Sequence, residues 1–553
     1  EFARTRSARA VLIDGAELPD GDLSDVVTVP GWDHQRRAVA FTETARALLL
    51  AIPMGGGKTA ATIAGLNRVQ AATVLIVCPN QVRAVWPRET REKSAISWHC
   101  EDGTRPPHRA GGRRQDLSAG DRLERMQRVL WGCDCGAPVH AFCINYEALA
   151  TPVWRKWQPP HPVDAIVYDE IHRLKSPTGA VSKVAAKWHG YARRHIGLSG
   201  TPLPQTPLDA FGVMRALDPG IFGTTWTGFK NRYAVMDPTG TFPITGRIQN
   251  GGELARKFMS ITYRPEIDLK LPPVLDVART AVLEPAARKV FDDIAAEFWA
   301  DLTPFVDARR ARGMTEEQAR ADVMAEIIST ADGPPSEITA PNVMTRLLRQ
   351  QQLTGGFLAD DEGVVRIVST AKRAAVAAWL ADEVVLRRDS GDPVVLFCRF
   401  HPDLDVAKAL AAEFGVRYGE ISGRAKTGLD SDARMHPDVD LVGVQIQSGG
   451  TGIDLTRARY GGWYSLGYSV SDYDQARKRL DRPGQTRPVT FAHFVVEDTA
   501  DQAVYDAIDN RRAVISEVLR EGEVDPASLG VSEPAPPRPE VARGSGSVRL
   551  PWD

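Results

Sequence analysis

Two series of short apolar runs, separated by segments of helical spacing, set the strongest limit on how this chain can fold. The first series lies between Ala47 and Tyr233 and contains ALLLAI, TVLIVCP, HAFCINY, DAIVYDE and HIGLSGTP. The second begins at Asp392 and contains PVVLFCRF, VRYGEIS, VDLVGVQIQS, GGWYSLGYS and PVTFAHFVV. Such runs, rich in valine and isoleucine and bounded by turn residues, are typical of buried parallel strands. The pattern predicts an α/β protein with two separate parallel sheets.

The length of 553 residues is too great for one hydrophobic core, so roughly three or four compact units are expected. The stretch between the two series is mostly helical in pattern, and MTEEQARADVMAEI within it opens with Thr315 and Gln318 at the spacing of a capping box. The tail contains EPAPPRPEVARGSGS, which cannot build a core, so we predict that it is disordered. The predicted segments are an N-terminal extension (1–30), a first α/β domain (31–270), a helical linker (271–370), a second α/β domain (371–522) and the tail (523–553).

The cysteine content and the apolar runs bear on where the protein resides. Six cysteines are too sparse for a disulfide framework, which favours a reducing compartment. No apolar run approaches the roughly 20 residues that span a bilayer, and we expect a cytoplasmic protein with no membrane partner. The native start is left open, because the sequence begins at Glu1 rather than methionine. The net charge of −2 does not by itself indicate nucleic-acid binding. Such binding would depend on local basic clusters such as RPPHRAGGRR and RKRLDRPGQTR.

The stretch AIPMGGGKT lies between the run ALLLAI and a segment of helical spacing, which is the setting of a phosphate-binding loop. Backbone N–H groups freed by glycine can cradle phosphate oxygens there, Lys58 can reach the β and γ phosphates, and Thr59 can hold Mg²⁺. The strict pattern G-x-x-x-x-G-K-[ST] requires glycine where this chain has Ile52, and the alternative is a glycine-rich turn before a chance Lys-Thr pair. The predicted nucleotide-binding residues of this stretch are Met54, Gly55, Gly56, Gly57, Lys58 and Thr59.

An acidic pair follows a second apolar run. The sequence VYDEIH places Asp169 and Glu170 at the carboxyl end of a predicted strand, where parallel sheets collect their ligands. Asp169 would bind Mg²⁺, directly or through water, and Glu170 would polarise the attacking water. Alone, such a pair is common and is usually a solvated turn.

The order of the remaining motifs carries a resemblance to a known family. SGTP (199–202), QSGGTGIDLT (447–456) and QARKRLDRPGQT (475–486) follow the two motifs above. Together they resemble the motifs of superfamily-two helicases and translocases, and more narrowly the Swi/Snf family of ATPases. The resemblance covers about residues 31–508 and implies two tandem RecA-like lobes that hydrolyse ATP between them with Mg²⁺. The family's phosphate loop, D-E-M-G-x-G-K-T, itself lacks the first glycine, so Ile52 is no objection to a nucleotide site.

The later motifs match the family residue by residue. Its pattern D-E-x-H-R-x-K-N is met here by DEIHRLKS, with Ser176 replacing asparagine, and its pattern Q-A-x-x-R-x-x-R-x-G-Q is met by QARKRLDRPGQ. The resemblance assigns Arg479 and Arg482 as fingers from the second lobe, and guanidinium groups can indeed neutralise charge on the transferring phosphoryl. It also assigns to the nucleotide site Gln35, the adenine reader of GWDHQ, together with Gly452, Asp454 and Gln475. Asp454 replaces the family's asparagine, and a surface glutamine is the alternative for Gln35.

The resemblance further implies nucleic-acid contacts at loops of both lobes, mostly to phosphates. The residues that it assigns are Asn80, Asn145, Tyr146, Arg399, Ser422, Gly423, Ser448 and Thr451. For each of them a structural role in a turn is an equal alternative.

The favoured function is an ATP-driven translocase on double-stranded DNA that remodels DNA or displaces bound proteins. A strand-separating DNA or RNA helicase, with single-stranded DNA or RNA as partner, is the first alternative. An inactive interaction scaffold is the second, and the complete catalytic set argues against it. A protein partner bound through the C-terminal tail is also considered. The biological pathway, the direction of travel and the oligomeric state are left open.

An insertion at about 97–138 of the first domain gathers cysteine and histidine residues. C-x-C with a third cysteine and a histidine can form a structural zinc site, so Cys100, Cys133, Cys135 and His140 are candidate ligands, with His99 and His108 nearby. The spacing matches no standard zinc signature, and ordinary free cysteines are the alternative. The remaining cysteines, Cys78, Cys143 and Cys398, lie in apolar runs and are expected in the core.

Overall fold

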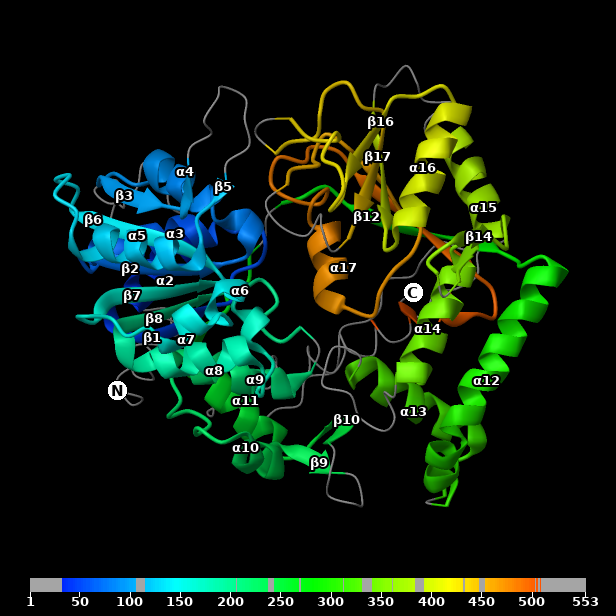
Figure 1. The fold of residues 1–553 in the computed structure, drawn as a ribbon, viewed down its shortest axis with the longest axis horizontal. Helices are drawn as coiled ribbons and strands as arrows, with labels where there is room; N and C mark the ends of the chain where they lie inside the picture. The colour runs from blue at the N-terminus through cyan, green and yellow to red at the C-terminus, as the bar shows by residue number, and fades with distance from the viewer. Residues whose placement is uncertain are drawn as a thin grey trace. The chain divides into compact units, whose positions relative to one another are not determined.

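The computed structural model describes residues 32–105, 115–204, 206–236, 243–267, 270–311, 313–330, 341–360, 362–382, 392–430, 433–446, 453–502, 504–505 and 508. These residues form two compact units, 32–267 and 270–508 (Figure 1). The predicted N-terminal extension and C-terminal tail lie outside the described residues. Within the described ranges, no helix is both long and apolar enough to cross a membrane.

The first unit is built on a seven-stranded sheet with the order β11-β1-β8-β7-β2-β6-β3. All of its strand pairs are parallel. Its strands are β1 (Ala47–Leu50), β2 (Thr73–Cys78), β3 (Trp98–Glu101), β6 (Val139–Asn145), β7 (Val163–Asp169), β8 (Ala192–Leu198) and β11 (Thr262–Tyr263). The first series of predicted strands is therefore confirmed as β1, β2, β6, β7 and β8.

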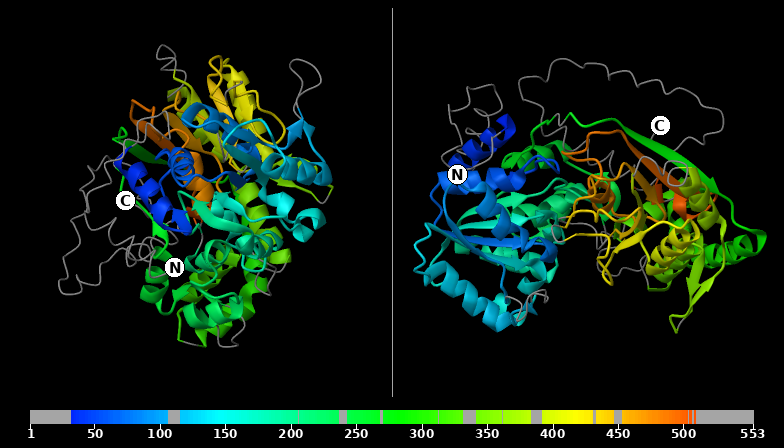
Figure 2. Two further views of the ribbon diagram at one scale, coloured as in Figure 1. Left: turned by 90° about the vertical axis from the view of Figure 1, so that its left-hand side faces the viewer. Right: turned by 90° about the horizontal axis from the view of Figure 1, so that it is seen from above.

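Helices cover both faces of this sheet, which explains why its strands are apolar throughout. Leu48 and Leu50 of β1 pack into one core with α2, α3 and α4, whereas Leu49 packs into the other with α5, α8 and α9. Figure 2 shows α2 and α5 on opposite faces. The helices are α2 (Asp33–Thr44), α3 (Lys58–Arg68), α4 (Val85–Lys93), α5 (Ala119–Trp131), α6 (Tyr146–Leu149), α7 (Pro152–Lys156), α8 (Ala180–Lys187), α9 (Ala210–Leu217), α10 (Trp226–Tyr233) and α11 (Gly251–Met259). Successive residues of a strand point to opposite faces, so a doubly covered sheet needs apolar side chains at every position.

Short elements connect these layers. They are the hairpins β4 (Thr104–Arg105) with β5 (Gln115–Asp116) and β9 (Ala234–Met236) with β10 (Pro243–Ile248), and the 3₁₀ turns η1 (Asn80–Val82), η2 (Ile171–Leu174), η3 (Trp188–Tyr191) and η4 (Pro207–Asp209).

The second unit contains a six-stranded sheet with the order β12-β19-β18-β15-β17-β16, again parallel throughout. Its strands are β12 (Val274–Ala281), β15 (Val394–Cys398), β16 (Tyr418–Ile421), β17 (Leu441–Gln445), β18 (Tyr460–Trp463) and β19 (Val489–Val496). The second predicted series is confirmed as β15 to β19. Two parallel α/β sheets in tandem are the architecture predicted from the sequence.

The segment predicted to be mostly helical belongs to the second unit. It contains α12 (Pro285–Arg310), α13 (Glu316–Thr330), α14 (Pro341–Thr354) and the hairpin β13 (Phe357–Ala359) with β14 (Val365–Ile367), and the later helices are α15 (Ala371–Leu380), α16 (His401–Glu413) and α17 (Val470–Arg477). The capping box is confirmed, because Thr315 N–H donates to Gln318 Oε1 at 3.0 Å and Gln318 N–H donates to Thr315 Oγ1 at 3.2 Å. Strand β12, at the start of this segment, is an edge strand of the sheet. It was not predicted, because the whole segment was expected to be mostly helical.

A half-buried ion pair fixes α17 to β12. Arg477 donates from both Nη atoms to the two carboxylate oxygens of Asp276, each at 2.6 Å. His493 of β19 lies 2.8 Å from the same carboxylate. A bidentate pair that is largely removed from water holds its partners in one geometry. The turn that follows α17, which carries Arg479 and Arg482, therefore begins from a rigid position.

Candidate nucleotide-binding and hydrolysis site

The phosphate loop joins the carboxyl end of β1 to the first residue of α3. Gly55 and Gly57 have φ values of +83° and +77°, a left-handed conformation that costs glycine nothing. A Cβ atom at Gly57 would lie 2.0 Å from Nε2 of Gln35, so a side chain is excluded there by contact as well as by conformation. The N–H groups in the first turn of a helix have no intrahelical partner and favour anions, so the start of α3 is suited to a phosphate.

Ile52 has a structural role that needs no glycine. Its side chain is fully buried in the core under the sheet. Its backbone carbonyl accepts a hydrogen bond from Lys58 Nζ at 3.1 Å. The carbonyl therefore holds the lysine over the loop, and the side chain at this position can be any residue that fits the core.

Gln35 packs directly on the phosphate loop. Its Oε1 accepts from Trp32 N–H at 3.1 Å, and its Nε2 donates to the Gly56 carbonyl at 3.2 Å. His34 Nε2 lies 2.7 Å from the same carbonyl. The amide predicted to read adenine is buried and bonded to the loop, so it braces the loop in this state of the protein.

The acidic pair lies at the carboxyl end of β7, as predicted. Asp169 is 9% exposed, and its Oδ2 accepts from the indole N–H of Trp86 at 3.0 Å. Burial, and after it the charge of Glu170, raises the pKa of Asp169 to about 6, whereas the Trp86 hydrogen bond and the charge of Lys58 act to lower it. A buried carboxylate that is costly to ionise fits a divalent cation. Asp169 and the hydroxyl of Thr59 are oxygen donors of the kind that Mg²⁺ prefers.

Glu170 connects the acidic pair to the SGTP motif. It has a φ of +55°, which is uncommon for a residue with a side chain and is typical of functional sites. Its Oε2 lies 3.3 Å from Nδ1 of His172, which in turn lies 3.1 Å from Oγ of Ser199. This chain of contacts links the group that would polarise water to the loop after β8.

Trp86 and Tyr146 hold Asp169 from two sides. The Tyr146 hydroxyl donates to the backbone carbonyl of Asp169 at 2.8 Å, and the tyrosine is 2% exposed. Its assignment as a nucleic-acid contact is corrected, because its ring is enclosed in the core beneath the acidic pair. Trp86 was not predicted, since an apolar position on α4 gives no sign that its N–H bonds to a carboxylate.

Replacing Trp86 with phenylalanine should lower the ATPase rate about tenfold and raise the Mg²⁺ concentration needed for half-maximal rate. The ring volume is nearly kept, but Asp169 loses the donor that orients it. Trp154→Phe is the matched control, because Trp154 is equally buried and, among the described residues, its indole nitrogen has no hydrogen-bond partner. ATPase assays over a range of Mg²⁺ concentrations measure both effects. Equal losses in the two variants would attribute the effect to packing rather than to the hydrogen bond.

The predicted arginine fingers follow α17 in the second unit. Arg479 is 5% exposed and Arg482 is half-buried. Each donates from Nη1 to the carbonyl of Ile453, at 3.4 Å and 3.2 Å. Both guanidinium groups are thus gathered at the start of the IDLT segment, and Arg482 is the more accessible of the two.

The other predicted nucleotide residues of this unit have local roles. Asp454 Oδ1 accepts from the N–H and the hydroxyl of Thr456, at 3.0 and 2.7 Å, so it caps its own turn. Gln475 is buried on α17 and donates to Ser471 Oγ at 3.1 Å. Gly452 lies outside the described residues.

The predicted nucleic-acid residues divide by exposure. Asn80 and Gly423 are exposed. Asn145 and Arg399 are half-buried and bonded to Arg122 and Gln351. The side chain of Ser422 is buried and donates to Glu420 Oε1 at 2.5 Å, so its assignment to a nucleic acid is corrected. Ser448 and Thr451 lie outside the described residues.

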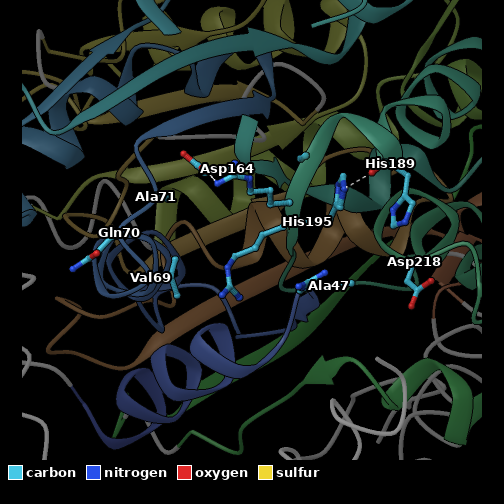
Figure 3. A pocket seen from close by; sticks show the side chains of 12 residues that line it. Ala47, Val69, Gln70, Ala71, Asp164, His189, His195 and Asp218 are labelled. Atoms are coloured by element: carbon cyan, nitrogen blue, oxygen red, sulfur yellow. Dashed lines mark hydrogen bonds and ion pairs between the residues drawn. The ribbon is translucent and has the colours of Figure 1, made fainter. Parts of the chain in front are cut away.

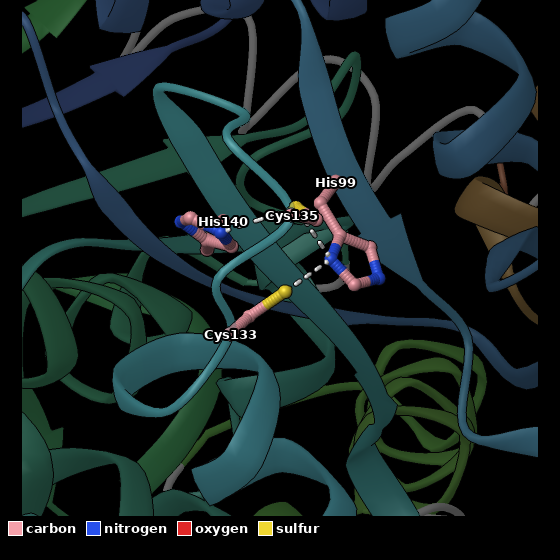
Figure 4. Close-up of side chains that lie close together, drawn as sticks. All are labelled: His99, Cys133, Cys135 and His140. Atoms are coloured by element: carbon pink, nitrogen blue, oxygen red, sulfur yellow. Dashed lines mark hydrogen bonds between the residues drawn. The ribbon is translucent and has the colours of Figure 1, made fainter.

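The predicted zinc ligands are only partly brought together. Cys133, Cys135 and His140 meet in one cluster, and His99 takes the fourth place that was predicted for Cys100 (Figure 4). Cys100 Sγ lies 3.8 Å from Cys143 Sγ, on the face of the sheet opposite to the cluster. Neighbouring residues of a strand face opposite ways, so His99 and Cys100 cannot both join the cluster. His108 lies outside the described residues.

A cavity of ≈ 620 Å³ lies at the opposite end of the first sheet from the phosphate loop (Figure 3). It is lined by the amino ends of β1, β7 and β8, including Ala47, Asp164 and His195. Its Arg194 donates to the carbonyls of Thr42 and Ala45 and so caps α2. The cavity contains none of the phosphate-loop or acidic-pair residues.

The fold and these motifs define a Swi/Snf-type ATPase of helicase superfamily two: the phosphate loop and the acidic pair belong to the first unit, and Arg479 and Arg482 belong to the second. The SNF2-related domain model matches residues 34–330, more than half of the sequence, and the chain belongs to that family. Hydrolysis of ATP with Mg²⁺ is the activity that this family membership implies.

Curated relatives resemble the chain at low identity. The Drosophila melanogaster SWI/SNF-related matrix-associated actin-dependent regulator of chromatin subfamily A-like protein 1 is 23% identical over 64% of this chain and 41% of its own length. Protein p41 of Acyrthosiphon pisum secondary endosymbiont phage 1 is 24% identical, over 83% of this chain and 92% of its own length. The mouse DNA annealing helicase and endonuclease ZRANB3 is 24% identical over 64% and 29%. The chain thus spans less than half of the fly and mouse proteins.

A solved structure of the Sulfolobus solfataricus SWI2/SNF2 ATPase core in complex with double-stranded DNA is 18% identical, covers 90% of this chain and 94% of its own, and has a TM-score of 0.36.

Proposed function

We propose that the protein is a DNA-dependent ATPase that moves along double-stranded DNA and thereby remodels it or displaces bound proteins. The observation that carries this proposal is the contact chain from Glu170 through His172 to Ser199. It links the group that would activate water to a loop beyond the nucleotide site. A change at the phosphate can therefore move that loop, which is what a motor requires of its ATPase centre.

DNA as the partner is supported by the mouse relative, which is a DNA annealing helicase and endonuclease by name. The exposed Asn80 presents a side-chain amide that suits phosphate contacts without sequence reading.

The test is steady-state ATP hydrolysis with no nucleic acid, single-stranded DNA, duplex DNA of increasing length, and structured RNA. We expect duplex DNA to raise the rate by roughly tenfold or more, with stimulation that grows with duplex length. A triplex substrate then separates movement from unwinding, because a translocase removes the third strand and leaves the duplex intact. Preference for single strands or RNA, or separation of the duplex, would replace this proposal with the helicase alternative.

A further inference from the structure

Four nitrogen and sulfur atoms converge beside the edge of the first sheet, away from the nucleotide site. The ligand atoms of His99, Cys133, Cys135 and His140, hereafter the Cys–His cluster, all lie within 4.8 Å of one another (Figure 4). Nδ1 of His99 is 3.0 Å from Cys133 Sγ and 3.3 Å from Cys135 Sγ, and Nε2 of His140 is 3.5 Å from Cys135 Sγ. Tetrahedral zinc with ordinary Zn–S and Zn–N bonds separates such atoms by about 3.6 Å.

The fold itself brings these residues together. His99 of β3 and His140 of β6 are directly paired in the parallel register, so their side chains leave the sheet on the same face. The two cysteines lie in the segment between α5 and β6, which turns through Gly136 at a φ of +77°. One histidine from each strand and two thiols from one loop are thus placed by separate elements.

A second layer of contacts orients the first histidine. Nε2 of His99 lies 3.0 Å from Glu101 Oε1. The same carboxylate accepts two hydrogen bonds from Arg125 of α5, each at 2.8 Å. With its Nε2–H donated to the carboxylate, His99 presents the lone pair of Nδ1 to the sulfurs. A carboxylate behind a histidine is the usual support of a metal ligand.

We propose that the Cys–His cluster binds one Zn²⁺ ion in a tetrahedral site with two sulfur and two nitrogen ligands. This donor set selects zinc among the common divalent metals. Four protein ligands leave no position for water, so the ion is structural. It fastens the 132–138 segment to β3 and protects that edge strand. Lys58 begins α3 and Asp169 ends β7, and neither belongs to β3 or β6, so the ion stabilises the first unit without entering the ATPase chemistry.

Metal content of the full chain tests this inference. Purified under reducing conditions and supplied with Zn²⁺, the protein should hold one zinc per chain by plasma mass spectrometry, and Cys133→Ser and Cys135→Ser should each lose most of it. Cys100→Ser is the matched control, because the Cys100 thiol is next to His99 on β3 but faces Cys143. The zinc content of this variant should not change. Chelation should lower the melting temperature of the unaltered protein and leave that of Cys135→Ser unmoved.

A measurement on the unaltered protein guards against variants that fail to fold. Stripped protein titrated with Co²⁺ should develop the visible absorption of tetrahedral cobalt with sulfur ligands, saturating at one ion per chain. Protein that takes up neither zinc nor cobalt would overturn the inference and leave the cysteines as free thiols. Loss of zinc from Cys100→Ser equal to that from Cys135→Ser would overturn the assigned donor set.

Discussion

Glu170→Gln should lower the ATPase rate on the order of 10²-fold or more while leaving ATP binding intact. The amide has the shape of the carboxylate but cannot draw a proton from the attacking water. Glu170 is 8% exposed, lies beside His172 and keeps a left-handed backbone that glutamine can adopt equally well. The measurements are the turnover rate and the affinity for a fluorescent ATP analogue, with and without duplex DNA.

Glu147→Gln is the matched control for this substitution. Glu147 is an exposed carboxylate on α6 that pairs with Arg173 at 3.1 Å, so the same chemical change there lies outside the acidic pair. Its turnover should stay within about twofold of the unaltered protein, since surface ion pairs contribute little. A Glu170→Gln protein that kept a tenth of the original rate would contradict the assigned role and direct attention to another base.

The central strands of both sheets could be predicted from the sequence, whereas three of the four edge strands, β3, β11 and β12, could not. Strands such as β2 and β15 are buried on both faces, and their unbroken apolar runs are visible directly. Strand β3 reads WHCE and is only half-buried, and β12 reads VLDVARTA with five of its eight residues half-buried or buried and three exposed. An edge strand leaves part of its surface to solvent, so its sequence lacks the signal that identifies a strand.

The nucleotide motifs located Lys58, Asp169 and Glu170, because the chemistry of phosphate binding fixes both residue type and spacing. The direction in which each side chain points could not be predicted from the sequence. Tyr146 follows a strand end, where either a solvent-facing or a core-facing ring fits the sequence, and the structure buries it. His99 and Cys100 are neighbours on one strand, and the sequence does not show which of them faces the loop cysteines. These choices depend on strand register, which tertiary packing sets.

Arg482→Lys should lower the ATPase rate on the order of 10³-fold, with little change in melting temperature or in binding to duplex DNA. Lysine keeps the positive charge but lacks the planar fork that spans two phosphoryl oxygens. Arg482 is half-buried and, among the described residues, donates to the Ile453 carbonyl, a contact that its guanidinium can leave for a phosphate. Turnover, thermal melting and DNA affinity measure the three properties separately.

Arg479→Lys should differ from Arg482→Lys in melting temperature, because Arg479 is the more buried of the two residues. Arg479 is 5% exposed, so its substitution should lower the melting temperature as well as the rate. Arg417→Lys is the control for charge-preserving change in the same unit, because Arg417 is a surface residue paired with Asp440, and both properties should hold. If Arg482→Lys also lowered the melting temperature, the arginine would be a support of the IDLT turn. If turnover survived, charge alone would suffice at that position, and the fork geometry would not be required for phosphoryl transfer.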